Sequence, residues 1–125
     1  MFRRGKSEAP QGKEEGLLSS ILLQHGDVSS DQLSISWVDV APGSVQRPHR
    51  HKPEQVYVIV RGRGRMRVEN EEEDVSEGDL VWIPSNALHG IENRSGDVLS
   101  YISAATPAFD LTAFYENRRR LDRSR

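Results

Sequence analysis

The sequence predicts an all-β protein, a barrel or a sandwich, from three observations. Short apolar segments follow one another along most of the 125-residue chain, and turn-forming residues separate them. One of these segments, Leu33–Trp37, alternates apolar and polar side chains with a period of two, as half-buried strands do. Helical periodicity is confined to residues 106–125. The length suits one domain with one core.

The chain begins with a polar segment, residues 1–16, which contains three glycines and a proline. We expect this segment to be an arm outside the core. Apolar residues then predict a first strand at Leu17–Gln24, with a turn at Gly26–Ser30. Leu33–Trp37 alternates with a period of two, and Ala41–Ser44 ends that strand.

The middle of the chain contains a hairpin and two further strands. Gln55–Val60 is rich in β-branched residues and predicts a strand. The acidic segment Glu69–Glu73 is expected to be a turn between strands at Arg65–Val68 and Asp74–Val75. A continuous apolar run that ends at Pro84 predicts a strand at Leu80–Ile83. The last two strands are expected at Gly90–Glu92 and Val98–Ala104.

The C-terminal segment, residues 106–125, predicts a short helix that begins at Thr106-Pro107 or at Asp110. Four apolar residues and one arginine recur at helical spacing, so they would share one face of the helix. They are Leu111, Phe114, Tyr115, Arg118 and Leu121. The expected organisation is therefore an arm over residues 1–16, a β-barrel over 17–105, and a helix with a tail over 106–125.

Composition excludes several classes of protein. The formal net charge of −2 and the pI of about 6.1 give no overall attraction to nucleic acid. No stretch reaches the roughly 20 apolar residues of a membrane span, and the charged N-terminus does not resemble a signal peptide. We therefore expect a cytoplasmic protein. The chain has no cysteine, so a thiolate metal site is impossible.

Three of the four histidines suggest a metal site. His49 and His51 are two residues apart, so on a strand both side chains point from the same face. His89 follows the turn at Pro84-Ser85-Asn86 and can approach from a neighbouring strand. A His-x-His pair alone is more often a surface accident than a site. His25 lies beside a glycine in an expected turn, and we interpret it as a surface residue.

Two spaced motifs contain these histidines. The first is GSVQRPHRHKPEQVYVIVRG from Gly43 to Gly62, and the second is GDLVWIPSNALHGIEN from Gly78 to Asn93. The order and spacing resemble the two motifs of the cupin superfamily, over roughly residues 33–105. This chain departs from the family pattern at two positions. Gln55 stands where the family has glutamate, and Asn86 stands where it has glycine, although asparagine tolerates the left-handed backbone.

The resemblance implies a specific fold and a cofactor. Cupins are jelly-roll barrels, also called double-stranded β-helices, so the expected fold is a cupin barrel with a short C-terminal helix. The family binds one divalent metal ion inside the barrel, which implies His49, His51 and His89 as ligands here. The resemblance also implies a small-molecule ligand or substrate and a homodimer. Nothing in it implies nucleic acid or a membrane as partner.

The fourth ligand is either Gln55 or Glu54. Gln55 shares strand parity with His51 and fits the motif spacing from both sides. Glu54 is chemically better for a divalent cation but has the opposite parity. A bulge at Pro53 would be needed to turn Glu54 inward.

A neutral glutamine ligand leaves two positive charges on the site, where a glutamate would leave one. Bound water is then more acidic, and an anionic substrate binds more favourably. Imidazole suits Fe, Ni, Cu and Zn, and oxygen ligands admit Mn, with Fe or Mn favoured if two positions stay open. The expected function is a metal-dependent, dioxygenase-like oxygenase acting on a small molecule. The alternatives are a non-enzymatic binding or sensing protein and a metal-dependent isomerase or lyase.

Six further residues are candidates for the pocket around the metal, although ordinary packing or an exposed surface explains each of them equally well. They are Trp37, Arg47, Tyr57, Met66, Trp82 and Phe109.

Overall fold

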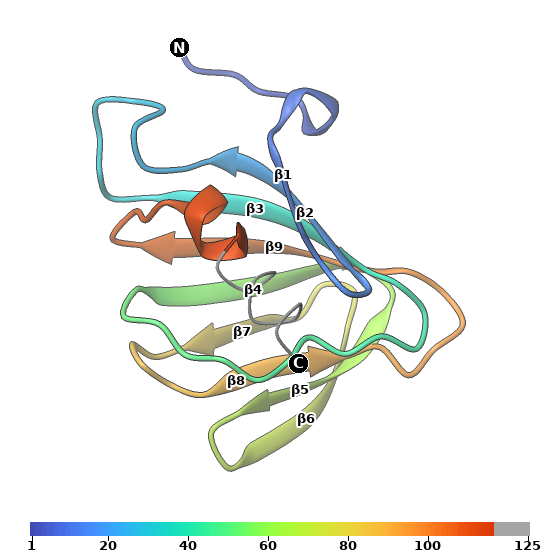
Figure 1. Ribbon diagram of the computed structural model, residues 1–125. Coiled ribbons are helices and arrows are strands. Elements are labelled where there is room, and N and C mark those ends of the chain that lie inside the picture. Colours follow the sequence, from blue (N-terminus) through green and yellow to red (C-terminus); the bar gives the residue numbers. More distant parts are fainter. Residues whose placement is uncertain (117–125) are drawn as a thin grey trace.

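The computed structural model describes residues 1–116, and its regular secondary structure is almost entirely antiparallel β-sheet (Figure 1). A six-stranded sheet has the order β1-β2-β3-β9-β4-β7, and a three-stranded sheet has the order β6-β5-β8. The strands are β1 (Gln11–Glu14), β2 (Leu17–Leu23), β3 (Ser34–Val40), β4 (Glu54–Arg61), β5 (Arg63–Val68), β6 (Glu71–Ser76), β7 (Leu80–Ile83), β8 (His89–Glu92) and β9 (Leu99–Thr106). The prediction of an all-β barrel with a short C-terminal helix is confirmed.

The strands expected from the sequence are all present, with bounds that differ by a few residues. The acidic turn is shorter than expected. Residues 71–74 belong to β6, so that the hairpin turn narrows to Glu69 and Asn70. Glu69 occupies the left-handed region with a φ of 52°. The hairpin register Val68↔Glu71 therefore replaces the five-residue turn.

The N-terminal segment differs from the expected arm, because Gln11–Glu14 forms the edge strand β1. A tight turn at Glu15 and Gly16 connects β1 to β2, and Gly16 has a φ of +77°. Before it, a 3₁₀ turn at Lys6–Glu8 lies against the sheet. The sequence did not predict this strand because its residues are mostly polar. An edge strand can be polar, since only one of its faces has to be buried.

The segment that contains His49 and His51 is extended but is not a regular strand. Pro48 and Pro53 cannot donate backbone hydrogen bonds, so they interrupt any continuous ladder. Isolated bridges pair Val45 with Glu92 and His49 with His89. This segment therefore lies along the free edge of β8 and closes that side of the barrel.

The main core lies between the two sheets and is aliphatic and aromatic. Its buried members are Leu17, Val38, Val40, Tyr57, Ile59, Met66, Val75, Ile83, Ala87, Ile91, Leu99 and Tyr101. A smaller cluster joins Ile21 of β2 to Leu111 and Tyr115. This cluster fastens the C-terminal helix to one end of the barrel.

The helix begins after Asp110 and is described over residues 111–116. The Ala113 backbone amide donates to the Asp110 carboxylate at 3.0 Å, so Asp110 is the N-cap. Leu111 and Tyr115 are buried as the spacing predicted. The remainder of the predicted helix, including Arg118 and Leu121, lies outside the described residues.

Candidate metal centre

His49 and His89 face each other across an isolated antiparallel β-bridge. Each backbone amide donates to the other residue's carbonyl oxygen at 2.9 Å, and the ring centroids are 4.3 Å apart. His51 is held from the opposite side, because the Asn86 backbone amide donates to its carbonyl oxygen at 2.8 Å. Asn86 has a φ of 63°, so asparagine does take the left-handed conformation expected of the family's glycine.

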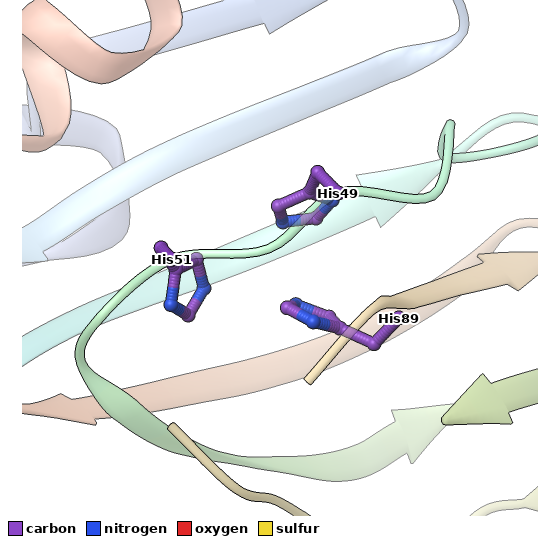
Figure 2. Close-up of side chains that lie close together, drawn as sticks. All are labelled: His49, His51 and His89. Atoms are coloured by element: carbon purple, nitrogen blue, oxygen red, sulfur yellow. The ribbon is translucent and has the colours of Figure 1, made fainter. Parts of the chain in front are cut away.

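The three imidazole rings point toward a common centre (Figure 2). One nitrogen from each of His49, His51 and His89 lies within 4.8 Å of the others. The ligands of a single ion lie closer than this, at most about 4.2 Å apart for bonds of about 2.1 Å, so small ring rotations are needed. His89 is buried and the other two are half-buried. This arrangement can hold a metal ion.

The tautomer of each ring follows from its backbone partner. The Nδ1 atoms of His49, His51 and His89 lie 3.1, 2.9 and 2.9 Å from the carbonyl oxygens of Arg47, Pro53 and Ala87. A carbonyl oxygen only accepts, so Nδ1 carries the proton in all three rings. Each neutral ring then presents the lone pair of Nε2 to the centre. Such outer hydrogen bonds orient metal-binding histidines.

Gln55 offers a fourth donor atom beside the three histidines. Its side chain is buried, and Oε1 lies 3.0 Å from Nε2 of His51. In the neutral ring both atoms carry lone pairs, so the two acceptors repel each other at this distance. A cation bound between them would make the contact favourable. Ligands at right angles on an octahedral ion, each about 2.1 Å from it, are also about 3.0 Å apart. The residues therefore fit a divalent ion.

Glu54, the alternative fourth ligand, lies on the other face of β4. Its side chain is exposed, and its carboxylate accepts a hydrogen bond from Trp82 Nε1 at 2.8 Å. Among the described residues, the cluster of metal-binding side chains contains the three histidines and no carboxylate. The bulge that would have turned Glu54 inward is not present, since β4 begins at Glu54 in regular register with β9.

Burial favours the neutral form of His51. Desolvation lowers the pKa of its imidazole, and this effect outweighs the hydrogen bonds to Pro53 and Gln55, which act in the opposite direction. The neutral ring is the form that binds metal, so protons compete weakly for this ligand at neutral pH.

Beneath the histidines lies a buried polar network. The Tyr57 hydroxyl donates to Gln46 Oε1 at 3.1 Å, and Gln46 Nε2 donates to the Tyr101 hydroxyl at 3.0 Å. The two tyrosine rings stack at 4.1 Å.

Above the histidines, Phe109 lies 5.6 Å from His51, and Phe114 lies 5.7 Å from His49, measured between ring centroids. The space enclosed is about 20 Å³, roughly enough for one water molecule.

Two of the six candidate pocket residues line this cavity, Tyr57 and Phe109. The other four lie elsewhere. Trp37 and Trp82 lie on the outer face of the six-stranded sheet, where Trp37 Nε1 donates to Asp39 and Trp82 is 56% exposed. Met66 is in the main core, and Arg47 lies beside Glu14 and Glu15 at a separate surface hollow.

Five of the remaining lining residues were not singled out from the sequence: Ser36, Val38, Gln46, Tyr101 and Ser103. The other three, Leu111, Phe114 and Tyr115, were predicted only as part of the apolar face of the C-terminal helix. Ser36 and Ser103 are directly paired between β3 and β9. Strand parity relates Ser36 to Val38 and Ser103 to Tyr101, so alternation would have found these four once one inward residue of each strand was known.

The chain belongs to the cupin family, because the Cupin domain profile matches residues 36–104. An uncharacterized protein of Methanocaldococcus jannaschii is 30% identical over 101 residues, which cover 80% of this chain and 81% of that protein. The dimethylsulfoniopropionate lyase DddW of Ruegeria pomeroyi is 26% identical over 69 residues, covering 55% of this chain and 45% of the lyase.

Solved cupin structures share the fold. An RmlC-like cupin from Shewanella frigidimarina superposes with a TM-score of 0.75 at 18% identity, covering 88% of this chain and 94% of the other. A predicted oxalate decarboxylase from Thermotoga maritima has a TM-score of 0.73 at 21% identity, with coverages of 86% and 99%. At these identities the likeness concerns the fold alone. Within residues 1–116, no helix has the length and apolarity needed to cross a membrane.

Proposed function

We propose that this chain is a metal-dependent enzyme that binds one divalent ion through His49, His51, Gln55 and His89. The proposal rests on one observation: one nitrogen from each of three oriented histidine rings and the Gln55 amide oxygen converge beside a small, largely buried cavity. A bound ion would act as a Lewis acid or as a redox centre for dioxygen. All four protein ligands are neutral, which favours an anionic small molecule as substrate.

The proposed reaction class is an oxygenase, with Fe or Mn as the favoured metal. No aspartate or glutamate is among the described residues that line the cavity. Tyr57 and Tyr101 line it, but burial raises the pKa of both hydroxyls above the ordinary value, so that neither is readily ionised. A reaction that needs a protein general base is therefore poorly supported. Oxygen chemistry on the metal needs no such base.

Metal content tests the site. We expect about one metal ion per chain in the wild type and loss of that ion in His49→Ala and His89→Ala. The matched control is His25→Ala, because His25 is exposed and lies outside the cluster. Thermal unfolding provides an independent readout, since a bound ion stabilises the folded state by mass action. Wild-type protein that stays metal-free after reconstitution with Fe(II), Mn(II), Ni(II), Cu(II) and Zn(II) would exclude the proposal.

Oxygen uptake tests the reaction class. Protein reconstituted with Fe(II) or Mn(II) should consume oxygen with at least one catechol, diketone or thiol substrate. The control is the Zn(II)-loaded protein, because zinc has no redox chemistry in proteins. Turnover that proceeds equally well with Zn(II), or without oxygen, would assign the enzyme to another class.

A lyase is the second candidate, and the similarity to the dimethylsulfoniopropionate lyase favours it. That similarity covers less than half of the lyase. Cleavage of dimethylsulfoniopropionate under anaerobic conditions would support the lyase and contradict the oxygenase. A small ligand that co-purifies and raises the unfolding temperature without being converted would instead support a binding or sensing role.

We also propose a cytoplasmic homodimer that pairs through the outer face of the six-stranded sheet. Val58 on this face lies beside Leu80 and Ile102 in neighbouring strands, and Leu80 is 60% exposed. Exposed apolar side chains of this kind mark association surfaces. Light scattering should report a dimer at micromolar concentration and a monomer for Val58→Lys. A monomeric wild type contradicts the dimer.

A further inference from the structure

We propose that Ser103 is the positioning residue that fixes the orientation of the Gln55 amide, so that its oxygen faces the metal. This inference rests on the proposed metal site and extends it. The Gln55 Nε2 atom donates to Ser103 Oγ at 2.5 Å, while Oε1 of the same amide faces His51 Nε2 at 3.0 Å. The serine therefore engages the end of the amide that cannot bind a metal.

The register of the sheet brings the two side chains together. Gln55 of β4 is paired with Ala105 of β9, and Ser103 is two residues from Ala105 on the same inward face. Diagonal neighbours of this kind are within reach of a long side chain. Gln55 is 7% exposed and Ser103 is 6% exposed, so water has little access to either group. The hydroxyl is the partner that the structure provides for the amide nitrogen.

An amide ligand needs such a partner, whereas a carboxylate does not. A carboxylate has two oxygens, and either can bind the ion. An amide has one oxygen and one nitrogen, and the nitrogen carries two hydrogens and no available lone pair. Rotation by half a turn would direct those hydrogens at His51 Nε2 and block the site. Without Ser103, the correct orientation would leave a buried donor unsatisfied, which is costly.

The role of Ser103 therefore depends on the presence of glutamine at position 55, where the family pattern has glutamate. Exchange of the carboxylate for glutamine removes a charge, but it also introduces two distinguishable orientations. Ser103 selects between them. We therefore expect the effect of Ser103 on the metal to depend on the residue at position 55, which an unrelated packing role of Ser103 would not predict.

Metal affinity in a double-mutant cycle tests this dependence, with a chelator as competitor and Co(II) or Zn(II) as probe. Ser103→Ala should weaken binding by roughly 10- to 100-fold, the range found when residues that orient metal ligands are removed. Ser103→Thr, which keeps the hydroxyl, should retain most of the affinity. In the Gln55→Glu background, Ser103→Ala should change the affinity by less than about threefold, because a carboxylate needs no orientation.

Ser36→Ala is the matched control. Ser36 is paired with Ser103 in the sheet, is 2% exposed and lines the same cavity, but no hydrogen bond joins it to Gln55 in the described part of the chain. The visible spectrum of the Co(II) protein should change in Ser103→Ala and stay unchanged in Ser36→Ala. Equal losses in the two alanine variants, or an undiminished loss in the Gln55→Glu background, overturn the inference. Wild-type protein without metal affinity overturns the proposed function together with it.

Discussion

The ring of Phe114 lies 5.7 Å from the ring of His49, although Phe114 belongs to the C-terminal helix and lies outside both metal-site motifs. Phe109 contacts His51 from the same segment at 5.6 Å. The residues that could hold the ion thus come from the barrel, and the residues that cover them come from the segment after β9. If an ion binds, separate parts of the chain would therefore supply its ligands and cover the site.

This separation predicts that Phe114→Ala speeds metal release without removing a ligand. The half-buried ring covers one side of the site, so its loss admits water and chelator. We expect at least a severalfold faster transfer of metal to a chelator, measured by stopped-flow absorbance. Stability should fall by about 1–2 kcal/mol, less than for a fully buried phenylalanine. Trp82→Ala, which removes an exposed ring from the outer face, should leave the release rate unchanged.

Asn86 links the second motif to His51, and its backbone geometry should control both stability and metal binding. With a φ of 63°, the position suits glycine or asparagine, and its amide donates to the His51 carbonyl oxygen at 2.8 Å. Asn86→Gly should keep both properties. Asn86→Val should destabilise the fold by about 1–2 kcal/mol and weaken metal binding. Urea unfolding and chelator competition measure the two effects, and a fully stable valine variant would contradict this explanation.

The sequence located the candidate ligands because spacing and strand parity are local properties. His49, His51 and His89 follow from the motifs, and parity favoured Gln55 over Glu54. The structure agrees with that choice to the extent that Gln55 points inward and Glu54 points outward. A two-residue period indicates which side chains share a face, and this information was sufficient to bring the candidate ligands together.

Strand parity alone does not indicate which face of a strand points into the barrel. For this reason Trp37 was wrongly considered a candidate pocket residue. Its strand buries Ser34, Ser36, Val38 and Val40 toward the barrel, while the tryptophan faces outward. The apolar ring is covered there by the N-terminal segment, with Lys6 Nζ 5.0 Å from the ring centre. That cover depends on a contact between residues far apart in sequence. The same limitation applies to Phe114, whose position over His49 depends on how the helix packs on the barrel.

The N-terminal segment also contributes an acid-sensitive contact through Asp39. The Asp39 carboxylate accepts hydrogen bonds from Ser100 at 2.6 Å, Trp37 at 3.0 Å and Lys6 at 3.0 Å. Burial by itself raises the pKa of this carboxyl, but the hydrogen bonds outweigh burial and the pKa lies below its ordinary value. The carboxylate thus stabilises the fold fully above its unfolded pKa of about 3.9, and this contribution is lost as the pH falls through the lower folded value.

We predict that Asp39→Asn lowers the free energy of unfolding at pH 7 by about 1–2 kcal/mol. The difference from wild type should begin to shrink below about pH 4, where the carboxyl of the unfolded chain takes up a proton, and should shrink further as the pH falls through the lower pKa of the folded protein. Urea unfolding between pH 7 and pH 2 measures this difference. Asp31→Asn, at an exposed position, should leave the pH dependence unchanged. A constant gap between Asp39→Asn and wild type at all pH values would show that the carboxylate charge is not the cause.

Gly12 of β1 packs against the helix that covers the candidate metal site. A Cβ atom at this position would lie within 2.8 Å of three atoms of the Tyr115 side chain. Tyr115 packs with Leu111 against Ile21, so it cannot move without loosening the helix. We expect Gly12→Ala to destabilise the protein by about 1–3 kcal/mol through overpacking. We also expect it to speed metal release, because Phe114 lies on the same helix.

The control for this effect is Gly96→Ala, where an added Cβ would meet no atom within 4 Å. A second test combines Gly12→Ala with Tyr115→Ala. Since the smaller side chain removes the clash, the double variant should be more stable than the sum of the two single losses predicts. Calorimetry gives the coupling free energy, and stopped-flow transfer of metal to a chelator gives the release rate. Additive losses would mean that Gly12 acts through β1 alone and that the helix does not transmit the change to the metal site.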